Sequence, residues 1–250
     1  MTFWEFFKYC IRLIFLPRSL RTMEWKMLSL VNKDRKENGL KKLRMQEDLR
    51  TVAREHSRDM ARKDYFEHKN TLGQTPFDRL ELARITDVVA GENLAKIRGY
   101  QIPVQRAQIG LMESPGHKAN ILKPDYNCVG IGIIKSEDQS FYFTQNFAKR
   151  ELVFTKKIEE IVNIKKGLRI KGYFFKELKD VIYQIKNHID DKTPLYENLV
   201  KGVEENFDFT VPFSEIGIYQ VLIFASTDPD RKNFHIVNKF SVKVRRGWFF

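Results

Sequence analysis

The sequence predicts an α+β protein, with an α/β/α sandwich in its first part and a small all-β domain after it. Before residue 150, apolar residues recur mainly at helical spacing, whereas after it they alternate with polar ones. Hydrophobic residues make up 42% of the 250 positions, enough to bury the cores of two ordinary domains. We therefore expect an N-terminal segment over 1–22, a first domain over 23–150 and a β-sandwich domain over 151–250.

The N-terminal segment is apolar from residue 3 to residue 16, but Glu5, Lys8 and Arg12 interrupt it. It is too short and too charged for a membrane-spanning helix, and it lacks the apolar core and small-residue cleavage site of a signal peptide. Two interpretations stay open. Residues 3–16 lie on a membrane surface as an amphipathic anchor, or they form a helix packed on the rest of the protein.

Charge and cysteine content exclude some classes of protein. The formal net charge of +12 suits acidic partners such as anionic lipid or wall polymers. The basic residues are spread along the chain without a compact block, so nucleic acid is not favoured as a partner. Two cysteines, Cys10 and Cys128, exclude a disulfide scaffold, and Cys128 is expected to be a small buried residue beside a strand.

In the first domain we expect five helices and a hairpin. A helix over 24–38 ends at Asn38-Gly39, and Asp48 caps a second helix that carries an apolar stripe. Thr75-Pro76 opens a short third helix. The remaining expected elements are helices over 105–112 and 114–122, and hairpin strands over 129–135 and 141–148.

In the second domain, short alternating segments predict five to seven strands, a number that suggests an immunoglobulin-like sandwich. The segment 218–225 is apolar on both faces, so we expect it at the centre of a sheet. Glycines separate the segments, as turns require. The other candidates are 168–175, 180–186, 206–213 and 234–244.

Six motifs in the first domain follow one another in an order typical of a known family. They are His56–Met60, Tyr65–His68, Gly91–Ala95, Ser114–Leu122, Val129–Gly132 and Phe143–Phe147. Together they resemble the bacterial CAP (SCP-like) domain of the cysteine-rich secretory protein, antigen 5 and pathogenesis-related superfamily. Each motif alone is weak, and their order makes the resemblance specific. It covers about half of the chain.

The resemblance implies an open polar cleft built from His68, Glu92 and His117. Two imidazoles and a carboxylate suit a divalent metal, zinc first or another divalent cation, with water completing the shell. They equally suit a general-base pair around a bound polar ligand. Spacing alone does not indicate a metal, because no two of these residues share a helix face.

Two histidines carry expectations of their own. Ser114 is a natural N-cap before Pro115, so His117 falls in the first helical turn, where the helix dipole disfavours its protonated form. His56 lies on the apolar stripe of its helix and is expected to be a packed structural residue.

The sequence departs from the four-residue cleft of animal and plant relatives. Tyr142 occupies the place of their second histidine, and Ser114 the place of their second glutamate. We include Ser114 and Tyr142 among the expected cleft residues. The four-residue set of the animal and plant relatives is therefore incomplete in this sequence.

The resemblance implies a ligand-binding or interaction module of the cell envelope or extracellular space. Its expected partners are lipid, cell-wall polymer or a protein ligand. The alternative is a metal-dependent hydrolase acting on peptide or wall polymer, with Glu92 as general base. The sequence shows no other catalytic signature.

Overall fold

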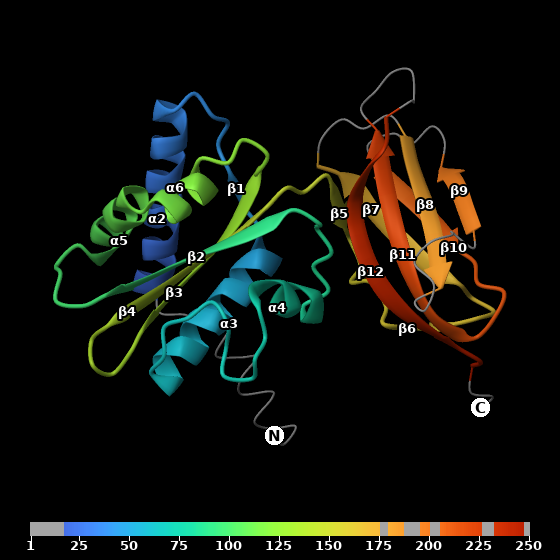
Figure 1. Cartoon of the computed structure of the whole chain (residues 1–250), viewed down its shortest axis with the longest axis horizontal. Coiled ribbons are helices and arrows are strands. Elements are labelled where there is room, and N and C mark those ends of the chain that lie inside the picture. Colours follow the sequence, from blue (N-terminus) through green and yellow to red (C-terminus); the bar gives the residue numbers. More distant parts are fainter. Residues whose placement is uncertain (1–17, 176–179, 188–195, 201–205, 227–232, 248–250) are drawn as a thin grey trace. The chain divides into compact units, whose positions relative to one another are not determined.

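The computed structural model describes residues 18–175, 180–187, 196–200, 206–226 and 233–247. The expected anchor over 3–16, with Cys10, lies outside these residues. The described residues form two compact units (Figure 1): unit 1 contains those up to Ile85 together with Ala90–Lys149, and unit 2 contains Thr86–Val89 and the described residues from Arg150 onward.

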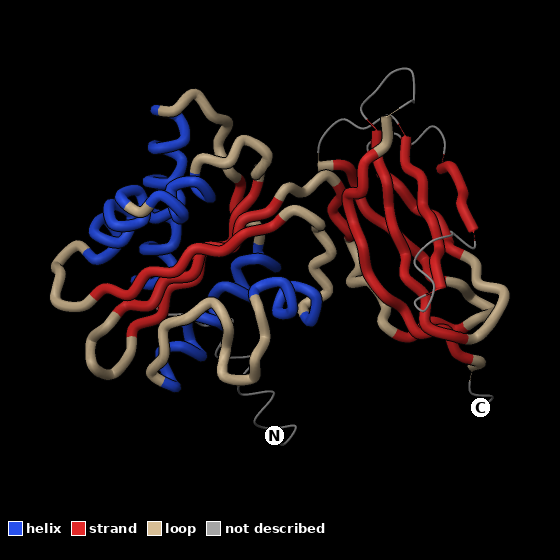
Figure 2. The backbone as a smooth tube through the Cα atoms, viewed as in Figure 1, coloured by secondary structure: helices blue, strands red, loops and turns tan. Residues whose placement is uncertain are grey.

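Unit 1 is a four-stranded sheet with helices on both faces, so the α+β class is confirmed (Figures 1 and 2). The strands lie in the order β1-β3-β4-β2, and β3 and β4 form the expected hairpin. The strands are β1 (Arg44–Met45), β2 (Ala90–Ile97), β3 (Cys128–Lys135) and β4 (Phe141–Ala148). The helices are α2 (Arg18–Glu37), α3 (Glu47–Lys63), α4 (Pro76–Leu82), α5 (Pro103–Glu113) and α6 (Pro115–Ile121).

Helix α3 packs directly on β3 because two glycines leave room for its backbone. A side chain at Gly130 would collide with the backbone of Leu49 and Arg50, and one at Gly132 with the backbone of Ala53 and Arg54. The strand is buried on both faces over most of its length. The Gly-x-Gly spacing therefore places one face of β3 against successive turns of α3.

Two helix starts and the buried cysteine test the sequence expectations. Thr75 caps α4 in a full capping box with Asp78, as expected from Thr75-Pro76. The expectation for α3 is wrong, because its N-cap is Gln46 and Asp48 lies inside the first turn, where its carboxylate accepts from the Leu49 amide. Cys128 is fully buried, as expected.

Strand β2 carries the Gly-Glu-Asn motif, and no strand is predicted there from the sequence. It pairs antiparallel with β4, so that Glu92 lies opposite Asn146 and Lys96 opposite Tyr142. Glu92 and Asn93 are buried. Polar residues at buried positions remove the apolar alternation by which strands are recognised.

Unit 2 contains two sheets around one apolar core. The sheet orders are β10-β7-β5 and β6-β12-β11-β8-β9, which places β11 centrally, as expected for 218–225. Ile170 and Phe207 from one sheet share the core with Val221 and Phe240 from the other. The described strands are β5 (Leu152–Phe154), β6 (Ile161–Asn163), β7 (Leu168–Phe174), β8 (Asp180–Asn187), β9 (Tyr196–Val200), β10 (Asn206–Val211), β11 (Gly217–Ser226) and β12 (His235–Arg245).

A short segment from the first half of the chain belongs to unit 2. Within residues 86–89, Asp87 forms a buried ion pair with Arg150, with 2.6 Å between Oδ2 and Nη2. Thr86 accepts a hydrogen bond from the Asn238 amide at 2.8 Å. A single boundary near residue 150 therefore does not describe how the chain divides.

Among the helices in the described part of the chain, none combines the length and apolarity needed to cross a bilayer.

Candidate functional site

The buried Glu92 carboxylate is the centre of the polar cluster in unit 1. Its side chain is 2% exposed, and both of its oxygens are bound. His68 Nδ1 lies 2.8 Å from Oε1, and Arg79 Nη2 donates to Oε2 at 2.6 Å. In its hydrogen-bonding orientation the Asn146 amide also donates to Oε2, at 3.2 Å. A buried charge of this kind is stable only when it is fully paired.

His68 is the exposed member of the cluster. It follows α3 in a loop, and 52% of its side chain is exposed. Since a carboxylate only accepts hydrogen bonds, the proton of the Glu92 bond is assigned to His68 Nδ1. In the neutral imidazole, Nε2 is then an acceptor, available to a donor from a ligand. The structure thus brings together His68 and Glu92, two of the expected cleft residues.

Arg79 is the residue that sequence reasoning missed. It lies on α4, where its Nη1 donates to the carbonyl oxygens of His68 at 2.8 Å and Gln74 at 3.1 Å. Its side chain is 9% exposed, and its Nε finds no partner among the described residues. One guanidinium thus fixes both the Glu92 carboxylate and the backbone that carries His68. An arginine within a short helix resembles a solvated surface residue, so the sequence gives no signal for this role.

His117 is held near the cluster by two asparagines. The Asn93 amide donates to the His117 carbonyl at 3.0 Å, and the Asn120 amide donates to Asn93 Oδ1 at 2.9 Å. These bonds tie α6 to β2. The pKa of His117 is lowered by burial and, to a smaller extent, by the charge of His68. The direction agrees with the expectation, and its largest cause is burial.

His56 lies beneath the cluster and is fully buried, as expected from its apolar stripe. Its Nε2 is 3.1 Å from the Glu67 carbonyl oxygen and 4.0 Å from Glu92 Oε1. A carbonyl only accepts, so Nε2 carries the proton, and Nδ1 has no partner in the described part of the chain. Burial lowers the pKa of His56.

The cluster does not fit the expected zinc ion. Over the described residues, no three His, Cys, Asp or Glu side chains are grouped as a metal site requires. The Glu92 carboxylate already accepts hydrogen bonds at both oxygens, from His68 at Oε1 and from Arg79 at Oε2. The metal set of His68, Glu92 and His117 therefore has no support in this geometry.

The other two expected cleft residues have different surroundings. Ser114 joins α5 to α6 as an N-cap by position, but its side chain makes no capping hydrogen bond. The Tyr142 hydroxyl donates to Asp64 at 3.2 Å, and the Lys96 ammonium lies 4.7 Å from the ring centre. Along β4, Tyr142 is four residues from Asn146, the partner of Glu92, which corresponds to about 13 Å.

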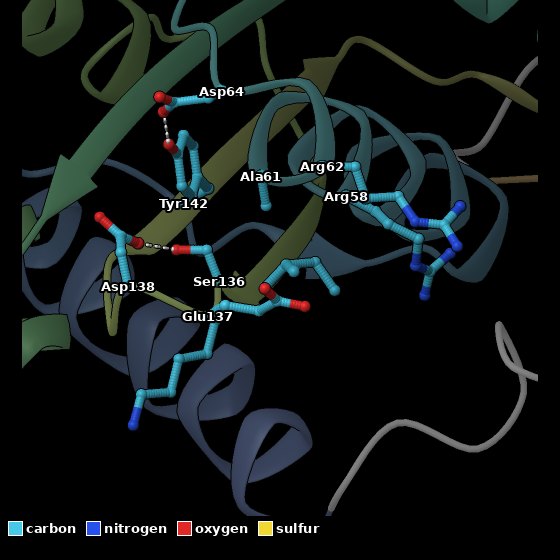
Figure 3. Close-up of a pocket in the computed structure, with 10 residues that line it drawn as sticks. Arg58, Ala61, Arg62, Asp64, Ser136, Glu137, Asp138 and Tyr142 are labelled. Atoms are coloured by element: carbon cyan, nitrogen blue, oxygen red, sulfur yellow. Dashed lines mark hydrogen bonds between the residues drawn. The ribbon is translucent and has the colours of Figure 1, made fainter.

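A separate pocket of about 570 Å³ lies between the end of α3 and the β3–β4 hairpin (Figure 3). Tyr142 lines it, with its hydroxyl directed at Asp64, and Ser136 is directed at Asp138. Three basic and three acidic side chains contribute to the lining, so the pocket has no single charge preference. They are Arg58, Arg62 and Lys135, and Asp64, Glu137 and Asp138.

The family model "CAP: Cysteine-rich secretory protein family" matches residues 28–147, a range that contains all six motifs. In Bacillus subtilis (strain 168), the uncharacterized protein YkwD is 38% identical over 120 residues, which are 48% of this chain and 46% of YkwD. The uncharacterized membrane protein YlbC of the same organism is 35% identical over 129 residues, 52% of this chain and 35% of YlbC. The chain thus spans less than half the length of these relatives.

Among solved structures, an extracellular protein of Bacillus anthracis containing an SCP domain is 27% identical, with a TM-score of 0.47. That match covers 54% of this chain and 44% of the other. An outer surface protein of Borrelia burgdorferi is 23% identical, with a TM-score of 0.48, over 52% of this chain and 93% of the other.

Proposed function

Residues 28–147 form a bacterial CAP domain, and from this premise we propose that the protein is a metal-independent binding module whose cleft at His68 holds a polar group of its partner. One observation carries the proposal. The exposed His68 ring is fixed by the buried Glu92 carboxylate, which is itself neutralised by Arg79. An imidazole that is oriented in advance loses little conformational freedom when it binds.

The chemistry of the cleft favours neutral hydrogen-bonding groups. His68 Nε2 accepts from a donor, and the lowered pKa of His117 favours a neutral second imidazole near it. Hydroxyl groups of a glycan and amide groups of a peptide provide such donors. We therefore place the ligand in a cell-wall polymer or a protein partner rather than in a lipid tail.

An envelope or extracellular location suits a partner of this kind. One relative, YlbC, is a membrane protein, and the matched family is named for secretory proteins. For unit 2 we propose an immunoglobulin-like accessory domain that positions the CAP domain. Its two sheets of three and five strands on one core support the sandwich fold.

The hydrolase alternative is less well supported. A general base needs a carboxylate oxygen that can accept a proton from water. Both oxygens of Glu92 are already bound, one by His68 and one by Arg79. The Glu92 side chain is also only 2% exposed, which leaves little of it accessible to a water molecule or a substrate.

The test is a glycan and peptide array probed with the full chain, with and without EDTA. We expect binding that EDTA does not change and that His68→Ala weakens by at least about tenfold, the value of one good hydrogen bond to an oriented group. His235→Ala is the matched control, because His235 also contacts a buried glutamate, Glu151, at 2.9 Å. EDTA-sensitive cleavage of the arrayed peptides would instead support the hydrolase, and binding indifferent to His68→Ala would refute the proposed site.

A further inference from the structure

The cation that neutralises Glu92 is built into the protein. Arg79 Nη2 lies 2.6 Å from Oε2, and Nη1 is held by the carbonyl oxygens of His68 and Gln74. The guanidinium therefore cannot turn away from the carboxylate without losing bonds at both nitrogens. Helix α4, which carries it, is fixed at its start by the capping box of Thr75 and Asp78.

We infer that Arg79 is a specificity-determining residue of the cleft, because it keeps divalent metal ions off the Glu92 carboxylate and leaves the site to neutral hydrogen-bonding ligands. The inference rests on the cleft assignment of the proposed function. It adds the reason why two histidines and a glutamate, a common zinc-binding set, do not form a metal site here.

Electrostatics provides the first reason. A divalent ion on Glu92 would lie within a few ångströms of the Arg79 charge in a site from which water is largely excluded. Repulsion between charges at such separations is several times stronger there than in bulk water. The negative charge that would offset it is already used by the guanidinium.

Ligand geometry provides the second reason. His68 donates from Nδ1 to Glu92 Oε1, and Arg79 donates to Oε2, so a metal ion on either oxygen would compete with a hydrogen bond that the carboxylate already accepts. Zinc needs several ligand atoms directed at one point. Removal of Arg79 would release Oε2 and leave an unpaired carboxylate beside His68. That carboxylate would then require another cation.

The experiment is a calorimetric titration of the full chain with zinc, with the protein purified without a metal-affinity tag. Wild type and Arg79→Lys, which keeps the positive charge, should bind no zinc at the cleft. Arg79→Gln should bind zinc at least about tenfold more tightly than wild type, because the repulsion is removed. The gain should disappear when His68→Ala is added. Arg169→Gln is the control, since Arg169 also pairs with a carboxylate, Asp208, at 2.7 Å, but on the surface of unit 2.

Melting temperatures, measured with and without zinc, show whether each variant folds. Zinc should raise the melting temperature of Arg79→Gln and leave that of wild type unchanged. If Arg79→Gln fails to fold even with zinc, the test rests on the wild type and Arg79→Lys. Zinc binding by either protein that is lost when His68→Ala is added overturns the inference. The absence of such zinc binding in both proteins supports it. A folded Arg79→Gln without a gain in zinc affinity also overturns it. These results do not depend on the array, so failure of the proposed ligand and failure of the inference are distinguishable.

Discussion

Arg79 and Glu92 form a buried ion pair in which a guanidinium on α4 neutralises a carboxylate on β2, with 2.6 Å between Nη2 and Oε2. The carboxylate in turn holds His68, whose ring is half exposed. The pair therefore links the stability of unit 1 to the orientation of the residue that we place in the ligand site.

Glu92→Gln should destabilise unit 1 strongly, because it leaves the Arg79 charge buried without a counter-charge. We expect a loss of about 3 to 5 kcal/mol in the free energy of unfolding, measured by denaturant titration. Asp208→Asn, which breaks the exposed pair with Arg169, should cost far less, because solvent screens that pair. Equal losses in the two variants would show that the buried pair has no special role.

The free energy of unfolding should fall as the pH drops below about 6.5, the ordinary pKa of histidine. Burial lowers the pKa of His56 and of His117 in the folded protein. In the window between the lowered and the ordinary pKa, the unfolded chain binds more protons than the folded one, so acid favours unfolding. His56→Gln removes one of these groups and should flatten the dependence. An unchanged slope would contradict the assignment.

Gly132→Ala should disrupt the packing of α3 on the sheet, because the added methyl group meets the backbone of Ala53 and Arg54. We expect a loss of about 1 to 3 kcal/mol in the free energy of unfolding, measured by thermal or denaturant unfolding. Gly110→Ala is the matched control, since it lies in α5 with open space around its Cβ, and it should raise stability by up to about 1 kcal/mol. Similar effects of the two changes would refute the close approach.

Tyr142→Phe should leave ligand binding at His68 unchanged. The Tyr142 hydroxyl donates to Asp64 in the pocket of Figure 3. On β4, Tyr142 lies four residues from Asn146, the residue that pairs with Glu92. Loss of that hydrogen bond should cost about 1 kcal/mol of stability. If binding on the array falls as much as in His68→Ala, Tyr142 belongs to the cleft, as the family comparison of its position implies.

Much of unit 1 could be predicted from the sequence because its signals are local. The amphipathic stripe that contains His56, the capping residues at Thr75 and the β3–β4 hairpin all depend on short stretches of chain. The six motifs also identify the family correctly, and the matched range contains them all.

What could not be predicted depends on contacts between distant segments. Glu92 is tolerable in the middle of β2 only because Arg79, thirteen positions earlier, neutralises it. Likewise, residues 86–89 join unit 2 through the pairing of Asp87 with Arg150, which no local pattern indicates. The strands β5 and β6 have three residues each, too few for their alternation to be recognised.

The most direct test of the account is nitrogen-15 NMR of the histidine side chains, recorded on the wild-type full chain at alkaline pH with and without zinc. We predict that His68 carries its proton on Nδ1, with Nε2 unprotonated, and that a slight excess of zinc leaves both signals in place. A proton on Nε2, or a zinc-dependent shift of the His68 signals, would contradict the claim that Glu92 and Arg79 hold this residue for a metal-independent ligand.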